Sequence, residues 1–415
     1  MKKKFIAALA LSLAVVSTLC SCGSTKLQVP TYKDDKAITI GIWNGSRHDM
    51  TDMELYNLQQ AGIDLLVGVG PKSMSEEDLL TRCADFGINC LIDQRPWNGQ
   101  VPSYIDMENF WGYCVYDEPF MGHATALQNM QAEYEKVMQD KMFFVNLLPS
   151  GGDSSTDYYT YLSTFVKGAN LPVLSYDNYS IMLDEYGDIY IRETYLFDFD
   201  VASYTAKENG VPLWYTLLTA DHLSYADPTT TDLEWQMYLA MTYGAKALIH
   251  YVYATHDTDY EFPIVDMEGN PTPKYYKVQE ADATIRSWDH IYMNFDWLGT
   301  SNVEGTNGKT GLLDLTIYNV DLTAFNTIVS AKATEDVIIG HFEDADKNAG
   351  FMVTNVTNPA DKKDTEVTVK LNKKYKGALV IHDGVEKVVA LKNGKLELDI
   401  PAGGAMFVIP LKEQK

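Results

Sequence analysis

Short runs of β-branched and aromatic residues alternate with stretches of helical period along the first two thirds of the chain. Eight such runs are bounded by turn residues, and they span 37–43, 63–70, 88–94, 111–117, 142–148, 171–177, 211–218 and 245–254. The segments between them predict helices over 50–62, 75–87, 123–140, 156–169, 192–210 and 230–245, with a final helix over about 274–293. This alternation predicts an α/β fold, a (β/α)8 TIM barrel over residues 37–297.

An open, doubly wound sheet is the alternative to the barrel. That fold usually places a glycine-rich phosphate loop after its first strand, and none follows residues 37–43 here. The pattern therefore favours the closed barrel. At the start of the sixth helix, Thr231 and Glu234 have the spacing of a capping box.

The pattern changes after Trp297. Residues 298–415 alternate short strands with turn signals, including Asn-Gly-Lys at 307–309 and again at 393–395, and contain no long helical pattern. They predict an all-β sandwich. The acidic stretch 343–350 is similar to a calcium loop, but its glycine stands at the seventh position and not the sixth, so we expect a polar hairpin tip.

The first 21 residues have the layout of a secretory signal, with three lysines, an apolar run and then small residues. The apolar run is too short to span a membrane. Leu19-Cys20-Ser21-Cys22 resembles a bacterial lipoprotein cleavage box, which implies lipidation of Cys22 and a tether over 22–36. We expect a membrane-anchored bacterial lipoprotein, periplasmic or at the cell surface.

Composition narrows the classes of partner. Removal of residues 1–21 deletes three lysines and no acid, which leaves 30 basic and 57 acidic residues and a formal charge of −27. Such a charge argues against a nucleic acid partner. Cys83, Cys90 and Cys114 lack metal-type spacing and are expected to be buried, and no motif indicates a metal or another cofactor. The pattern does not indicate an oligomeric state.

Candidate chemistry gathers at the predicted strand ends, where barrels of this kind form their sites. Asp221 and His222 follow the seventh strand. The residues that we expect to contact substrate are Trp43, Arg95, Trp97, Asn146, Tyr176, Tyr179, Trp214, His250, Tyr251 and Tyr253, and the candidate catalytic residues are Asp117, Glu118 and Asp177. Aromatic planes suit the C–H faces of sugars, and glycosidic cleavage needs two carboxyl groups, one protonated and one ionised. The mixture therefore predicts a carbohydrate ligand.

Asp117-Glu118-Pro119 ends the fourth predicted strand. The whole layout, with a barrel and a C-terminal β-sandwich, resembles the clan A glycoside hydrolases of bacterial glycan-degrading systems. In that clan the acid/base glutamate ends the fourth strand, commonly within Asn-Glu-Pro. The resemblance implies that Glu118 is the general acid/base of a glycosidase.

The chain departs from the clan at strand seven. Clan A places its nucleophilic glutamate there, whereas this chain has "WYTLLTADH". Asp177, at the end of strand six, is the first candidate for the second carboxylate. Adjacent strands are about 4.8 Å apart, so an offset of two strands spans about 10 Å, which allows a retaining or an inverting pair.

Two alternatives stay open. An Asp-Glu pair at the fourth strand also resembles the β-hexosaminidases, in which the glutamate protonates the leaving oxygen and the aspartate orients the substrate's own N-acetyl group. Asp117 could join Glu118 in that role only if the strand breaks between them, since consecutive strand residues face opposite sides. The other alternative is a surface glycan-binding lipoprotein without catalysis, which the missing strand-seven glutamate favours.

Overall fold

The computed structural model describes residues 26–44, 49–254, 260–261 and 263–414. The predicted signal and the lipidation site at Cys22 lie outside the described residues. Within them, no helix is both long enough and apolar enough to cross a membrane.

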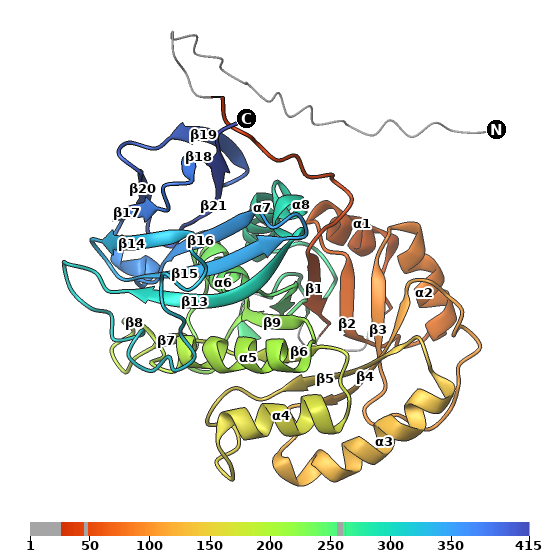
Figure 1. Cartoon of the computed structure of the whole chain (residues 1–415). Coiled ribbons are helices and arrows are strands. Elements are labelled where there is room, and N and C mark those ends of the chain that lie inside the picture. Colours follow the sequence, from red (N-terminus) through yellow and green to blue (C-terminus); the bar gives the residue numbers. More distant parts are fainter. Residues whose placement is uncertain (1–25, 45–48, 255–259, 262, 415) are drawn as a thin grey trace.

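Eight parallel strands close into a barrel (Figure 1). They are β1 (Thr39–Trp43), β2 (Leu65–Val69), β3 (Asn89–Asp93), β4 (Phe110–Asp117), β5 (Met142–Leu147), β6 (Leu174–Asp177), β9 (Leu213–Leu218) and β11 (Ala247–Tyr251). Each strand pairs with its neighbours in chain order, and β11 closes the ring against β1. The predicted barrel is confirmed, and only β4 begins outside its predicted run, by one residue.

Helices cover the outside of the barrel. They are α1 (Asp52–Gln60), α2 (Glu76–Asp85), α3 (Ala124–Val137), α4 (Tyr158–Gly168), α5 (Tyr195–Asn209), α6 (Thr230–Thr242), α7 (Pro273–Arg286) and α8 (Asp289–Tyr292), with a 3-10 turn η1 (Met121–His123) before α3. The described loop between β3 and β4 contains no helix. The predicted capping box of α6 is wrong by two residues, because the helix begins at Thr230 and its box is formed by Thr229 and Asp232.

Two small ribbons were not predicted from the sequence. β7 (Ile181–Leu183) and β8 (Ile189–Ile191) form an antiparallel hairpin between β6 and α5, so α5 begins three residues later than predicted. β10 (Asp221–His222) pairs with β12 (Tyr260–Glu261). Both ribbons are inserted after barrel strands, on the side where the strands end.

The rest of the chain forms two antiparallel sheets, which confirms the predicted all-β region. One sheet has the order β13-β15-β16-β21-β18-β19 and the other β14-β17-β20. The strands are β13 (Phe295–Val303), β14 (Ile328–Ala333), β15 (Val337–Asp344), β16 (Ala349–Asn355), β17 (Thr365–Leu371), β18 (Tyr375–His382), β19 (Val385–Ala390), β20 (Lys395–Ile400) and β21 (Ala405–Lys412), with a 3-10 turn η2 (Pro359–Asp361). β13 begins at Phe295, two residues before the predicted end of the barrel region.

The two Asn-Gly-Lys signals have different outcomes. The second leads through a turn with positive φ at Asn393 and Gly394 into β20. The first does not join paired strands, because residues 304–327 form a long connection between β13 and β14. The acidic stretch forms the expected hairpin tip between β15 and β16, where Asp344 accepts hydrogen bonds from the backbone N and the side-chain Nδ2 of Asn348.

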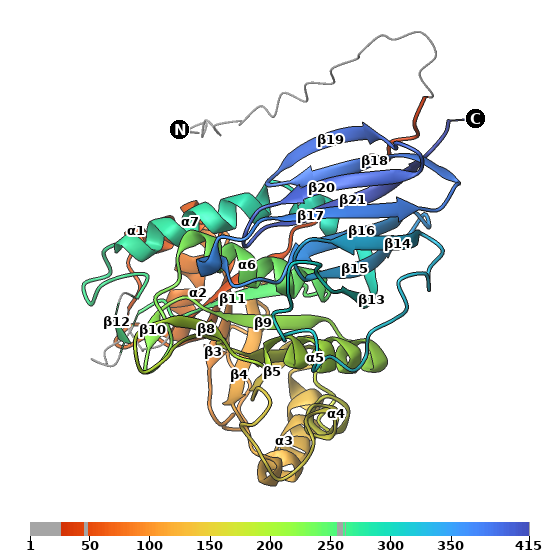
Figure 2. The same ribbon diagram turned by 90° about the vertical axis from the view of Figure 1, so that its left-hand side faces the viewer.

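Helix α6 joins the two parts of the molecule and lies between the barrel and the sheets in Figure 2. Its Trp235 is buried and donates from Nε1 to the carbonyl of Asn355, 2.9 Å away. Thr242, at the end of the helix, shares a 2.6 Å hydrogen bond with the hydroxyl of Thr354. One hydrophobic core therefore continues from the barrel helices into the larger sheet.

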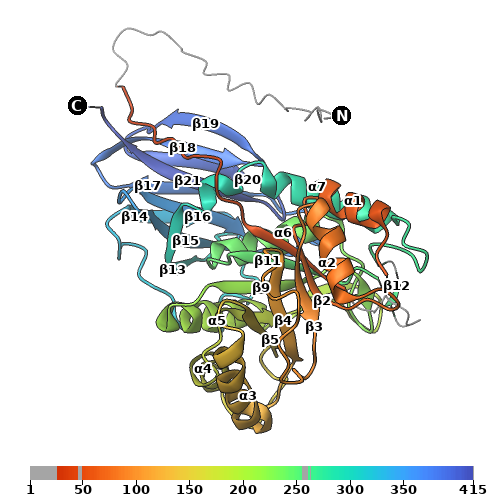
Figure 3. The same ribbon diagram turned by 90° about the vertical axis from the view of Figure 1, so that its right-hand side faces the viewer.

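The segment predicted as a tether packs against the sheets from its first described residue (Figure 3). Leu27 forms an antiparallel bridge with Glu413, and the backbone N of Gln28 donates to the carbonyl of Lys412. Tyr32 packs against Phe295 and donates from its hydroxyl to Asp344. Residues 26–36 are thus bound to the sheet domain and do not form a free linker.

Candidate active site

Strand β4 ends in a backbone break at Glu118. This residue has φ +51°, in the left-handed region that residues other than glycine seldom adopt. Its backbone N donates to the carbonyl of Asn146 at 2.9 Å, which fixes the turn against β5. The break allows Asp117 and Glu118 to line the same cavity, although they are consecutive. A strand break at this point is the condition under which the two residues were predicted to act together.

The cavity has a volume of about 300 Å³ and lies at the C-terminal ends of the barrel strands. Its lining combines three carboxyl groups with amide, hydroxyl, aromatic and cationic side chains. The lining residues are Trp43, Asp117, Glu118, Asn146, Leu148, Pro149, Asp177, Tyr179, Arg192, Thr216, His222, Leu223, Tyr225 and Tyr251.

The carboxyl group of Glu118 is held in its protonated form to higher pH than usual. Burial is the main cause of its raised pKa, and the negative charge of Asp117 adds to it. A hydrogen bond with Asp177 acts in the opposite direction. These conditions suit a proton donor near neutral pH.

Asp177 is only 5% exposed and lies at the end of β6. Asn146 donates to it from Nδ2 at 2.7 Å and accepts at its own Oδ1 from the hydroxyl of Ser175, which fixes the orientation of the amide. Burial, followed by the charges of Glu118 and Asp117, raises the pKa of Asp177 well above its usual value. Two acids in contact cannot both ionise readily, so Glu118 and Asp177 form a pair that retains a proton.

Asp117 is held from two sides. Arg95 lies 3.3 Å from its carboxylate and also 2.7 Å from Asp93, and Asn146 approaches at 3.4 Å. Burial raises the pKa of Asp117, while the charge of Arg95 lowers it. About a third of the side chain (35%) is exposed, so water screens Asp117 more than it screens Asp177.

Aromatic rings form one wall of the cavity. Tyr179 stacks on Tyr251 with ring centres 5.3 Å apart and an interplanar angle of 28°. His222 and Tyr225 pack edge-on against Tyr179, each with ring centres 5.5 Å away. Trp43 also lines the cavity, and the guanidinium of Arg95 lies 5.8 Å from the centre of its ring.

The structure brings together seven of the thirteen residues predicted from sequence to act in catalysis or to contact substrate. They are Trp43, Asp117, Glu118, Asn146, Asp177, Tyr179 and Tyr251. Arg95 does not line the cavity but holds Asp117. The other five do not line the cavity, contrary to their prediction as substrate contacts.

Strand alternation explains two of these differences, and depth within the barrel explains a third. Tyr176 precedes Asp177 and points to the opposite side, where it packs against Phe199. His250 likewise precedes Tyr251 and is fully buried, with 2.9 Å contacts to Thr219 and Asp282. Trp214 lies two residues before Thr216, so it packs deeper inside the barrel, against Phe144.

The remaining two, Trp97 and Tyr253, contact side chains of helices outside the barrel. Trp97 packs against Tyr134 of α3, with ring centres 5.0 Å apart. Tyr253 is buried and donates from its hydroxyl to Glu54 of α1 at 3.1 Å. Both positions follow strand ends in sequence, but neither side chain reaches the cavity.

Several lining residues were not assigned a role from sequence. Thr216 follows from the strand register, since it pairs with Asp177 across β6 and β9, and its buried hydroxyl has no hydrogen-bond partner among the described residues. His222 lies at the strand end that the sequence had indicated. Arg192 and Tyr225 come from long insertions, for which strand counting offers no signal.

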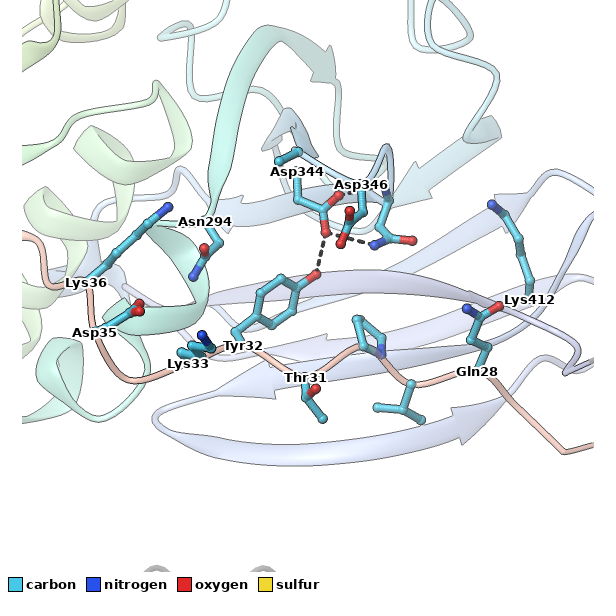
Figure 4. A pocket seen from close by; sticks show the side chains of 14 residues that line it. Gln28, Thr31, Tyr32, Lys33, Asp35, Lys36, Asn294, Asp344, Asp346 and Lys412 are labelled. Carbon is cyan, nitrogen blue, oxygen red and sulfur yellow. Dashed lines mark hydrogen bonds between the residues drawn. The ribbon is translucent and has the colours of Figure 1, made fainter.

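No other described feature competes as a metal or catalytic centre. Within the described ranges, no group of three or more His, Cys, Asp or Glu side chains could hold a metal ion. A larger cavity, of about 690 Å³, lies between residues 28–36 and the sheet domain (Figure 4). Its Asp344 is already occupied by hydrogen bonds from Tyr32 and Asn348, so the cavity reflects the packing of this segment.

Comparisons with known proteins show similarity in fold. No family model and no curated protein matches the sequence. A solved structure described as a glycoside hydrolase is 12% identical, with a TM-score of 0.57 over 91% of this chain and 93% of that chain. A glycoside hydrolase family 5 structure from Bacteroides vulgatus is 10% identical, with a TM-score of 0.55 over 91% and 89%. An Anoxybacillus α-amylase is also 10% identical, with a TM-score of 0.50 over 91% and 98%. The chain therefore has the fold of glycoside hydrolases that combine a (β/α)8 barrel with a further β-sheet domain.

Proposed function

We propose that the protein is a glycoside hydrolase in which Glu118 is the general acid/base. The observation that carries this proposal is the contact between Glu118 and Asp177 in an aromatic cavity at the strand ends. Burial and a neighbouring negative charge keep Glu118 protonated to higher pH. The glycoside hydrolase folds of the similar structures support the same conclusion.

In the first version of the mechanism, Asp177 is the second carboxyl group. Glu118 donates its proton to the glycosidic oxygen, and Asp177, once ionised, acts on the anomeric carbon directly or through water. A retaining pair is separated by about 5 to 5.5 Å and an inverting pair by about 6.5 to 9.5 Å. A sugar bound between the two groups would replace the hydrogen bond that links Glu118 to Asp177.

Replacement of Glu118 by glutamine tests this assignment. Glu118→Gln should lower kcat on aryl and natural glycosides by about 10²-fold or more, because the proton donor is lost. Affinity for the same sugars, measured by calorimetry, should change little. A variant with undiminished turnover would refute the role of Glu118, and wild-type protein that binds glycans but cleaves none would support the non-catalytic alternative.

A second mechanism is favoured by the break at Glu118. Because that break brings Asp117 to the cavity, Asp117 could orient a substrate N-acetyl group as the nucleophile while Glu118 protonates the leaving oxygen. In the described residues, no carboxylate from β9 lines the cavity. This version requires 2-acetamido sugars, so paired aryl glycosides with 2-acetamido or 2-hydroxyl groups distinguish it from the first.

We also propose that the protein is lipid-anchored through Cys22, outside the cytoplasm. The support is the N-terminal sequence alone, with its lysines, apolar run and cysteine. Cys22→Ala should move the protein from the membrane fraction to the soluble fraction of an expressing bacterium. An unchanged distribution would contradict the proposed anchor.

A further inference from the structure

One arginine, Arg192, lines the cavity, whereas Arg95 lies outside the lining and contacts Asp117. Arg192 directly follows the β7–β8 hairpin and lines the cavity together with Glu118 and Asp177. Its backbone N donates to the carbonyl of Ser180 at 2.9 Å, which holds the hairpin arm in place. Its Nη2 donates to the hydroxyl of Tyr225 at 3.1 Å, and the guanidinium lies 5.7 Å from the centre of that ring.

Arg192 differs from the other described arginines in having no acidic partner. Arg82, Arg95 and Arg286 each lie within salt-bridge distance of an aspartate. Among the described residues, no carboxylate comes within 4.0 Å of Arg192. A guanidinium has five N–H donors. Among the described residues, the side chain of Arg192 donates to the hydroxyl of Tyr225 and, at 3.6 Å, to the sulfur of Met182. Donors of Arg192 therefore remain for a ligand.

The acids near Arg192 do not neutralise it. Asp198 is the buried carboxyl group whose pKa responds to the charge of Arg192, but burial raises that pKa to about 7 and its Oδ2 accepts from Asn178 at 2.8 Å. In the cavity, Asp117 is already paired with Arg95. The pair of carboxyl groups of Glu118 and Asp177 retains a proton, which reduces the negative charge of the pair.

We propose that the cavity binds a sugar with an anionic substituent, a carboxylate or a sulfate ester, and that Arg192 binds this group through paired hydrogen bonds. The planar fork of arginine matches both groups. The inference rests on the proposed sugar-binding role of the cavity but not on turnover. Arg192 is thus a specificity-determining residue, placed on an insertion that strand counting does not detect.

Binding to the Glu118→Gln protein tests the proposal without hydrolysis. The ligands are methyl glucuronoside and methyl galacturonoside, the 6-sulfated methyl glucoside and galactoside, and the neutral parent methyl glycosides, each as both anomers. At least one anionic sugar should bind about tenfold or more tightly than its neutral parent, a ratio equal to about 1.4 kcal/mol. The uronosides and the sulfated sugars separate the two possible substituents.

The added change Arg192→Gln should remove this preference, because the affinity for anionic sugars should fall about tenfold more than the affinity for their neutral parents, and Arg192→Lys should restore part of it. Arg82→Gln, which removes the same charge from helix α2, should have no effect. Equal affinity for charged and neutral sugars, no binding of any anionic sugar, or equal loss of both on Arg192→Gln would overturn the proposal. Turnover of Glu118→Gln is measured separately from binding, so the proposed reaction and the proposed preference for anionic sugars are tested independently.

Discussion

At the scale of single residues, Glu118 combines a left-handed backbone conformation with a raised side-chain pKa. A left-handed conformation at a residue other than glycine costs about 1 kcal/mol or more and persists where surrounding contacts impose it. Here the hydrogen bond from its backbone N to Asn146 imposes it. The gain is that two consecutive acids face one cavity.

The pH dependence of activity should report the interaction between these acids. As the proposed general acid, Glu118 must be protonated to act, so kcat/KM should fall as the pH rises through its raised pKa. Asp117→Asn removes a negative charge that raises this pKa, so the alkaline limb of the profile should move to lower pH. Asp85→Asn, on the outer face of α2, should leave the profile unchanged. An alkaline limb that does not move in Asp117→Asn would show that Glu118 does not set it.

Asp177 should reduce stability at neutral pH. Its pKa is raised in the folded state, so the folded protein retains this proton to higher pH than the unfolded chain, and stability decreases as the pH rises above the unfolded value of about 4. Asp177→Asn should therefore raise Tm at pH 7, and the difference should disappear near pH 4. Thermal unfolding at both pH values tests this. A lower Tm at pH 7 would mean that the lost hydrogen bonds outweigh the buried charge.

The sequence could indicate the acids of this site but not all of their surroundings. Glu118 and Asp177 stand at strand ends, so strand counting was sufficient to find them. Tyr176 and His250 do not line the cavity, because strand alternation points them to the outer layer. Arg192 was missed because its position depends on how the β7–β8 hairpin folds back over the barrel.

At the scale of elements, the barrel strands were predictable and the insertions were not. The strands are apolar and bounded by turn residues, whereas residues 181–191 form a short ribbon whose pairing depends on the turn at 184–188. The start of α6 also differs between the sequence prediction and the structure. Thr229 and Thr231 both precede an acid by three residues, and only the structure distinguishes them.

Alanine substitution at Thr229 and at Thr231 should distinguish the two possible N-terminal caps of α6. Thr229→Ala removes a hydroxyl that accepts from the backbone N of Asp232 and donates to its carboxylate, so the free energy of unfolding should fall by about 1 kcal/mol. The matched Thr231→Ala, at an exposed position inside the helix, should cost clearly less. Chemical denaturation measures both. Equal losses would contradict the capping role of Thr229.

At the scale of the whole molecule, the barrel and the sheets share a core around α6. Gly340 of β15 shows how closely they pack, because an added Cβ would lie 2.2 Å from the carbonyl oxygen of Thr242. Sequence pattern predicted the two regions separately. It did not predict their contact, since α6 has apolar residues on nearly every face and its pattern does not say what covers each one.

Gly340→Ala should therefore destabilise the whole protein. We expect a loss of about 1 to 3 kcal/mol, the usual cost of overpacking, within a single unfolding transition. Gly122→Ala is the control, because an added Cβ there meets no atom within 4 Å. Separate transitions for barrel and sheets, measured by calorimetry, would show that the shared core does not couple them.

The pairing of residues 26–28 with the last strand has a practical consequence. Those residues lie beside β21, whereas β10, which contributes His222 to the cavity, lies on another side of the molecule (Figure 2). A support or affinity matrix attached ahead of Lys26 would hold the protein by its sheets and leave the mouth of the barrel open to large polymers. An immobilised preparation made this way should show the proposed glycosidase activity at the same rate per mole as the free protein.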